Sequence, residues 1–187
     1  MKENILVVNI CKEKLHYFEF VKPICDILKK ENIKYFIRDY KKISKSDLKK
    51  ASRVIICGTS LYDNEFIKNI SKFKWLPEYS KPVLGICGGM QIMGLIFGGS
   101  VRKMTEIGFY SEFFSKEFLG LHEKNEVYHL HNNYIDFSKL EMFKVYCGNE
   151  FSQAVKHKEK DIYCVLFHPE VRNKDLIIRF CSLGYKE

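Results

Sequence analysis

Residues 82–99 read PVLGICGGMQIMGLIFGG, and this stretch predicts a strand, a tight turn and a helix. A short apolar run from Val83 to Ile86 is interrupted by glycine and followed by apolar residues at helical spacing. Cys87 falls at the turn between the two elements. A turn of this kind is usually strained, and the glycines around it let the backbone bend and approach closely. The stretch therefore predicts a cysteine at the carboxyl edge of a sheet.

Two interpretations of Cys87 follow from this position. A helix N-terminus offers unpaired backbone N–H groups and a partial positive charge, and both favour a thiolate over a thiol. A nucleophilic cysteine is therefore one interpretation. The other is a buried structural cysteine, which is the usual place of a free cysteine in a folded protein. The turn pattern by itself leaves both interpretations open.

A candidate partner for Cys87 lies near the other end of the chain. Residues 162–167 form an apolar run typical of a buried strand, and His168, Pro169 and Glu170 follow it directly. In an α/β protein such a strand end lies at the same sheet edge as the Cys87 turn. A thiol, an imidazole base and a carboxylate that orients the base are the parts of an activated nucleophile. The sequence thus predicts that the three groups meet.

Two motifs resemble those of the class I, triad-type glutamine amidotransferases. GICGGMQ at residues 85–91 resembles the nucleophile elbow of that family, and FHPEV at residues 167–171 resembles its second signature. Their order and separation suit a glutaminase domain of this size, so the resemblance covers nearly the whole chain. It implies a flavodoxin-like, three-layer α/β sandwich with a mainly parallel central sheet and a small antiparallel excursion. We expect one domain over residues 1–187.

The resemblance also implies a reaction. Cys87, His168 and Glu170 would form a catalytic triad that hydrolyses the side-chain amide of L-glutamine to glutamate and ammonia. No cofactor is implied. The backbone N–H group of Gly88 would hold the oxyanion, together with that of Gly58 or Thr59.

The second oxyanion loop departs from the family pattern. This loop is usually Gly-Gly-Pro in the family, whereas this chain keeps Gly58 and has Thr59 and Ser60 after it. Backbone donors need no particular side chain, so we expect the oxyanion hole to be retained. Threonine nevertheless restricts φ where glycine would not.

A substrate-binding segment is expected at residues 127–134, which read VYHLHNNY and resemble the glutamine-recognition segment of the family. The resemblance implies four substrate-binding residues, namely Gln91, His131, Asn132 and Asn133. For His131 a place in the substrate loop is favoured over a surface histidine, and for His129 the surface interpretation is favoured. No metal site is expected, because this i, i+2 histidine pair has no carboxylate or cysteine at ligand spacing.

The remaining elements follow from apolar periodicity. Strands are expected at 4–10, 33–39 and 53–57, with a helix carrying Phe18, Val21, Cys25 and Leu28 between the first two and a short helix opened by Ser46, Asp47 and Leu48. Pro23 would start or kink the first of these helices. Between residues 101 and 147, short aromatic-rich pieces predict inserted antiparallel strands. A hairpin over 151–155 and 162–167 and a final helix over 174–183 complete the expected order.

Composition places the chain among ordinary globular proteins. It has 187 residues, of which 46% are hydrophobic and 29% charged. The net charge of +8 comes mainly from dispersed lysines without an arginine-rich stripe, which argues against a nucleic-acid partner. The sequence has no apolar run long enough to span a membrane, so a cytoplasmic protein is expected. The seven cysteines include no CxxC pair, which argues against a disulfide framework or a zinc site.

The partner of such a glutaminase would be a separate chain. The sequence contains no Walker-type glycine loop and nothing that resembles an ATP-binding synthase domain, so the ammonia acceptor is expected on an ATP-dependent synthase subunit. The carboxyl-terminal part most resembles the stand-alone glutaminase subunit of archaeal-type GMP synthase. Two alternatives remain open: a partner-independent cysteine hydrolase of γ-glutamyl compounds or other amides, and a catalytically silent binding subunit.

Overall fold

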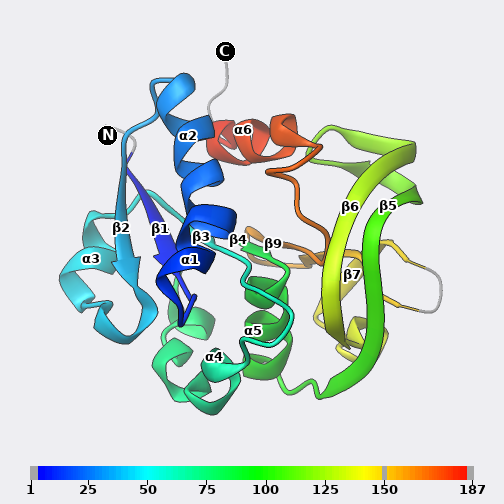
Figure 1. The fold of residues 1–187 in the computed structure, drawn as a ribbon, viewed down its shortest axis with the longest axis horizontal. Helices are drawn as coiled ribbons and strands as arrows, with labels where there is room; N and C mark the ends of the chain where they lie inside the picture. The colour runs from blue at the N-terminus through cyan, green and yellow to red at the C-terminus, as the bar shows by residue number, and fades with distance from the viewer. Residues whose placement is uncertain (1–3, 149–150, 185–187) are drawn as a thin grey trace.

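The computed structural model describes residues 4–148 and 151–184, and within these ranges a nine-stranded mixed sheet forms the centre of the fold (Figure 1). Five of its strands are parallel and lie in the order β2-β1-β3-β4-β9. Their bounds are Ile5–Asn9 (β1), Tyr35–Asp39 (β2), Arg53–Ile56 (β3), Val83–Ile86 (β4) and Ile162–Val165 (β9). This is the strand order of flavodoxin-like sheets. The predicted α/β class is confirmed.

Apolar side chains cover both faces of the parallel sheet, which explains why its strands read as continuous apolar runs. Ile5 and Val7 lie in one core cluster, and Leu6 and Val8 lie in the other. The first face is covered by α2 (Lys22–Lys30) and α6 (Lys174–Ser182), and the second by α4 (Glu65–Lys68) and α5 (Gly88–Ile96). The layers form the expected three-layer sandwich.

The first helical segment contains an irregular turn that the periodicity does not reveal. A short α1 (Lys14–His16) runs into a π-helical turn at Tyr17–Val21 before α2 begins. A π turn has a wider i, i+5 spacing, so residues three positions apart within it no longer share one face. Phe18, expected on the inward face, is therefore 51% exposed, whereas Phe20 and Val21 are buried.

Local capping determines where a short helix begins, and 3₁₀ turns connect several other elements. Helix α3 spans Lys45–Lys50 and begins slightly earlier than expected, because Ser44 and Asp47 form a capping box in which each side chain accepts from the other backbone N–H. In the described part of the chain, 3₁₀ turns link other elements at Tyr40–Lys42, Ile70–Phe73, Leu76–Glu78 and Phe137–Lys139.

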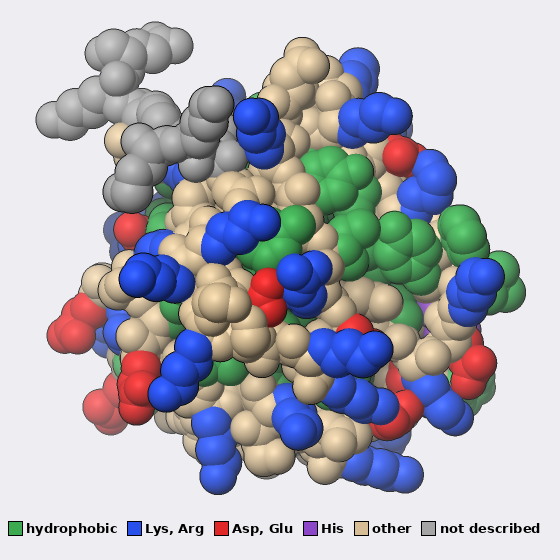
Figure 2. Space-filling model, turned by 90° about the vertical axis from the view of Figure 1, so that its left-hand side faces the viewer, with side chains coloured by type: hydrophobic (Ala, Val, Ile, Leu, Met, Phe, Trp, Pro, Cys, Tyr) green, Lys and Arg blue, Asp and Glu red, His purple; other side chains and the backbone are tan. Residues whose placement is uncertain are grey.

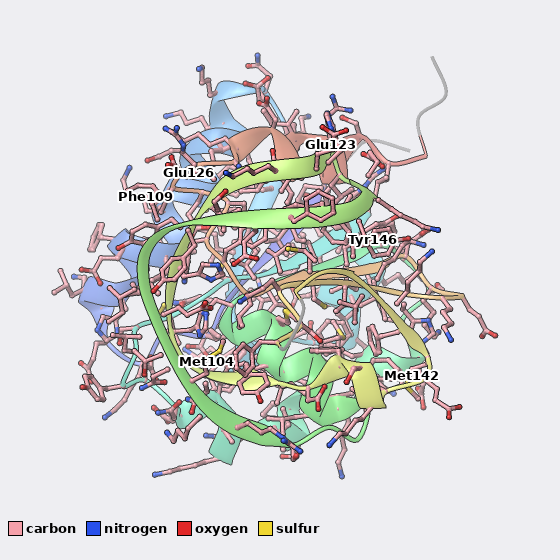
Figure 3. The ribbon with its side chains drawn as sticks, turned by 90° about the vertical axis from the view of Figure 1, so that its right-hand side faces the viewer. Met104, Phe109, Glu123, Glu126, Met142 and Tyr146 are labelled. Carbon is pink, nitrogen blue, oxygen red and sulfur yellow. The ribbon has the colours of Figure 1, made fainter. Side chains whose placement is uncertain are left out.

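The antiparallel part of the sheet is dominated by one long hairpin. Strands β5 (Val101–Phe118) and β6 (Leu121–Ile135) are much longer than the expected short pieces, and they join β7 (Phe143–Cys147) and β8 (Ala154–His157). The hairpin curls along one side of the molecule from Met104 to its turn near Glu123 (Figure 3).

The hairpin curls back to the end of the parallel sheet. There the His168 N–H donates to the Tyr128 carbonyl at 2.8 Å, which brings β6 beside the segment that follows β9. The antiparallel excursion therefore supplies one wall at the sheet's carboxyl edge.

The predicted β8–β9 hairpin and the final helix α6 are both confirmed. Lysine and arginine side chains are spread over the face shown in Figure 2, with acidic side chains among them. Among the helices that the structure describes, none combines the length and apolar character needed to cross a membrane.

Candidate active site

Cys87 lies on a strained turn between β4 and α5. Its backbone has φ 48° and ψ −102°, a positive-φ conformation that costs free energy for a residue with a Cβ. The turn is held because the Cys87 N–H donates to the Val165 carbonyl of β9 at 2.8 Å. The helix packs tightly on the sheet, and a Cβ at Gly89 would lie 2.4 Å from the Ile56 carbonyl oxygen. Glycine is required there for this close approach.

His168 and Glu170 form a buried pair directly after β9. The Nδ1 atom of His168 lies 2.8 Å from Oε1 of Glu170, and the two residues are 1% and 4% exposed. A carboxylate can only accept at this position, so Nδ1 carries the proton and Nε2 is left available. Nε2 of His168 makes no hydrogen bond to another described residue, and the Cys87 sulfur lies close enough to act on the ring electrostatically.

The charge state of His168 is set by two opposing effects. Burial by itself lowers the pKa of the imidazole, but the Glu170 carboxylate and the Cys87 sulfur outweigh it and hold the pKa well above its usual range. A protonated imidazole between a carboxylate and a thiol favours the thiolate. The arrangement can therefore supply a nucleophile and a proton donor together.

Gly58, Thr59 and Gly88 lie around Cys87, where the oxyanion hole is expected. Thr59 and Gly88 line the same small pocket as Cys87, and a Cβ at Gly58 would lie 3.3 Å from the Cys87 Cβ. Gly88 is the first residue of α5, and the first N–H groups of an α-helix have no acceptor within the helix. The Gly88 N–H can therefore donate to a bound oxyanion.

Thr59 is accommodated in the oxyanion loop by a hydrogen bond that the sequence does not reveal. The residues with positive φ in the described part of the chain do not include Thr59, so its β-branched side chain causes no left-handed strain. Its Oγ1 donates to Oδ2 of Asp63 at 2.8 Å, and the Lys12 N–H donates to the same oxygen at 2.7 Å. Asp63 thus fixes the loop through its side chain.

We expect Thr59→Val to lower the free energy of unfolding by about 1–3 kcal/mol, because it removes one donor from the buried Asp63 carboxylate while keeping the shape of the side chain. Denaturant unfolding measures the change. Thr59→Ser keeps the hydroxyl and serves as the control. Equal stability losses in both variants would show that the Asp63 contact does not hold the loop.

A narrow pocket opens beside the Cys87 turn. Its cavity of about 10 Å³ has room for about one water, and it is lined by residues of α5, of β6 and of the loop after β3. Gln91 donates through Nε2 to the Asn133 carbonyl at 3.3 Å, while its Oε1 has no hydrogen-bond partner among the described residues. Asn132 and Asn133 line the same pocket. Gln91 therefore has an unused acceptor, and it lines the same pocket as Cys87.

The two histidines of β6 are both buried, so the surface interpretation favoured for His129 is wrong. His129 and His131 are 0% and 2% exposed, and Nδ1 of the first lies 3.2 Å from Nε2 of the second. His131 lines the Cys87 pocket, but its Nε2 bonds to Glu106 of β5 at 2.9 Å. No metal site was expected here, because the sequence around the two histidines has no carboxylate at ligand spacing. That reason does not hold in the fold, since the neighbouring strand β5 places Glu106 beside both rings.

Comparison with known proteins agrees with this architecture. The glutamine amidotransferase class-I family model matches residues 16–179. A glutamine-hydrolysing GMP synthase subunit of Pyrococcus abyssi is 34% identical over 119 residues, covering 57% of this chain and 62% of the relative. The corresponding subunit of Picrophilus torridus is 30% identical over 132 residues, covering 67% and 70%. The chain spans only 20% of the GMP synthase of Spiroplasma kunkelii, to which it is 36% identical over 103 residues.

Solved structures show the same fold. A protein of Thermoplasma acidophilum, provisionally assigned as a GMP synthase subunit, superposes with a TM-score of 0.84 at 24% identity and covers 97% of this chain and 94% of its own. A glutamine amidotransferase of Thermotoga maritima superposes with a TM-score of 0.71 at 21% identity, covering 91% and 77%. The family model matches residues 16–179, and Cys87 lies on a strained turn between β4 and α5. The chain therefore belongs to the class I glutamine amidotransferase family.

Proposed function

We propose that this chain hydrolyses L-glutamine to glutamate and ammonia through Cys87, His168 and Glu170. The observation that carries the proposal is the buried His168–Glu170 pair, 2.8 Å apart, beside the strained Cys87: a Cβ built at Gly58 would contact both the imidazole and the Cys87 Cβ. The family membership supports the same reaction class. The proposal treats residues 1–187 as one glutaminase domain, of which 4–148 and 151–184 are described.

The reaction follows from the positions of these groups. The Cys87 thiolate attacks the amide carbon and forms a C–S bond, and the Gly88 N–H and the Gly58–Thr59 backbone hold the oxyanion. His168 gives its proton to the amide nitrogen, and the C–N bond breaks to release ammonia and leave a thioester. His168 then takes a proton from water, which attacks the thioester carbon. The C–S bond breaks, and glutamate leaves.

Substrate recognition is assigned to the pocket beside Cys87. The unpartnered Oε1 of Gln91 can accept a hydrogen bond from the α-ammonium group of glutamine, and Asn132 and Asn133 offer further polar groups. His131 would contribute through its backbone, because its ring is bonded to Glu106 and His129. The cavity of about 10 Å³ is too small for glutamine, so at least one wall of the pocket has to move outward on binding.

A partner chain is proposed as the acceptor of the ammonia. Two apolar side chains are exposed beside the site, Tyr62 at 90% and Val171 at 46%. Tyr62 and Val171 line a wider hollow of about 460 Å³ that also reaches His168. Exposed apolar groups of this kind suit a protein interface. We place an ATP-dependent synthase subunit here, and a docked partner could open the loop at Tyr62.

We propose that the synthase subunit that receives the ammonia is that of a GMP synthase, because several relatives are named as glutamine-hydrolysing subunits of GMP synthase. The test measures glutamate released from glutamine by this chain, alone and with the synthase subunit from the same cell. Stimulation by the synthase and transfer of ammonia to its product would support the assignment. Faster hydrolysis of γ-glutamyl peptides than of glutamine, unaffected by the synthase, would instead identify a partner-independent hydrolase.

We expect Glu170→Gln to lower kcat/KM for glutamine by about 100-fold and to move the alkaline limb of its pH profile to lower pH. The Glu170 carboxylate opposes the effect of burial on the pKa of His168, so its neutralisation lowers that pKa. A pH profile of kcat/KM for both proteins measures the shift. An alkaline limb that stays in place would show that Glu170 does not set the charge of His168.

The same variant gives a stability test. The pKa of His168 in the folded protein lies above the unfolded value of about 6.5. Protonated His168 therefore stabilises the fold below about pH 6.5, and this contribution is lost as the pH rises through the folded pKa. Urea unfolding of the parent at several pH values should show this decline, and Glu170→Gln should flatten it.

A further inference from the structure

A second cluster of titratable side chains lies beside the proposed active site, within the β5–β6 hairpin. Glu106 of β5 is paired across the hairpin with His131 of β6, and His129 lies two residues before it on the same face. Figure 3 labels Met104 and Phe109, which flank Glu106 on β5. Both histidines are buried, and the Glu106 side chain is 16% exposed. None of the three side chains takes part in the proposed hydrolysis.

Three potential ligand atoms converge in this cluster. Nε2 of His131 is 2.9 Å from Oε2 of Glu106, Nδ1 of His129 is 3.6 Å from the same oxygen, and the two ring nitrogens are 3.2 Å apart. In a tetrahedral zinc site with bonds of about 2.0–2.1 Å, neighbouring ligand atoms are about 3.3–3.4 Å apart. The three observed separations bracket that distance, so one ion could reach all three atoms with small side-chain adjustments.

The groups around these atoms are those that orient metal ligands. Metal-bound histidines usually donate their other ring N–H to a carboxylate or a carbonyl. Nε2 of His129 lies 3.3 Å from Oε1 of Glu112, which fixes the tautomer that leaves Nδ1 free to bind an ion. Nδ1 of His131 is buried and has no hydrogen-bond partner among the described residues, so it can carry the ring proton when Nε2 binds an ion.

The carboxylate is supported in the same way. Nε2 of Gln153 donates to Oε2 of Glu106 at 2.8 Å, and Gln153 is itself 3% exposed. Its Oε1 finds no hydrogen-bond partner in the described ranges 4–148 and 151–184. The cluster thus has two histidines and one carboxylate as ligands, which is the donor set of many three-ligand zinc sites, and Glu112 and Gln153 orient His129 and Glu106.

We propose that Glu106, His129 and His131 bind one divalent transition-metal ion, for which Zn²⁺ is the probe, with the fourth position open to water. Imidazole nitrogen and carboxylate oxygen suit Zn²⁺ and exclude a site built for Mg²⁺ or Ca²⁺. The ion would join β5 to β6 beside Leu130, whose carbonyl lies 3.7 Å from the Cys87 sulfur. The proposal stands independently of the proposed glutaminase reaction.

The first test is a crystal of the full chain carrying Cys87→Ser, soaked with Zn²⁺ and measured at the zinc absorption edge. The substitution removes the thiol at the Cys87–His168 pair, which could otherwise bind zinc. We expect one anomalous peak between the three ligand atoms. Peaks only at the surface or at His168 would overturn the proposal, and this result does not depend on whether any ligand variant folds.

Calorimetric titration of the same protein with Zn²⁺ gives the second test. We expect one ion per chain and a loss of affinity of about 10-fold or more in Glu106→Gln, which keeps the side-chain shape. His122→Gln is the matched control, because His122 lies on the same hairpin but is exposed. Its affinity should match that of the parent. Undiminished zinc affinity in a folded Glu106→Gln protein, checked by circular dichroism, would overturn the proposal.

Discussion

Replacing Cys87 by alanine is expected to lower kcat for glutamine hydrolysis by about 10³-fold or more, because the variant has no atom that can form the thioester. The side chain lies on the turn before α5, so its truncation removes the sulfur without a break in β4 or the helix. Release of glutamate, measured in the presence of the synthase partner, checks the prediction. A substantially smaller loss would leave another group as the nucleophile.

Cys25→Ala is the control for this experiment. Cys25 is buried on α2, where desolvation raises the pKa of its thiol to about 11, so it is protonated at neutral pH. Its replacement should cost stability through lost packing and leave kcat nearly unchanged. Full glutaminase activity in Cys87→Ala would remove Cys87 from the mechanism, whatever the activity of Cys25→Ala.

The second large effect is expected at Gly58. A Cβ built there would lie 2.6 Å from Cε1 of His168 and 3.3 Å from the Cys87 Cβ. No real Cβ tolerates the first contact, so Gly58→Ala must displace the imidazole or the oxyanion loop. A misplacement of about 1 Å at a reacting group can cost about 100-fold in rate. We expect a loss of that size in kcat/KM for glutamine.

Gly184→Ala is the matched control for Gly58→Ala. Gly184 has φ +81°, and a Cβ there would meet no atom within 4 Å among the described residues. Its replacement adds backbone strain at the end of α6 but leaves the site undisturbed. Equal losses of kcat/KM in the two variants would show that contact with His168 does not explain the effect at Gly58.

Much of the parallel sheet could be predicted from the sequence because its signals are local. Strands buried on both faces read as unbroken apolar runs, and the glycines around Cys87 mark the turn that follows β4. Cys87 and His168 could be proposed together for the same reason, since each follows such a run. Parallel strands end at one edge, so no long-range information was needed to bring them near each other.

The parts that could not be predicted depend on pairing between distant segments. The register of β5 and β6 places Glu106 opposite His131, and no local pattern around either residue indicates that partner. Asp63 is similar, because its role depends on contacts with Thr59 and with the backbone of Lys12, 51 residues away. The exposure of Phe18 was missed because a π turn leaves no clear periodic signal.

Covalent labelling of Cys87 by a glutamine-shaped chloroketone tests the central claim most directly. Burial raises the pKa of the Cys11 and Cys25 thiols to about 11, so these cysteines should react slowly at neutral pH. Peptide mass spectrometry of the chain with its synthase partner should show one modification, at Cys87, that glutamine prevents. No modification at Cys87, or one that glutamine does not slow, would contradict the account.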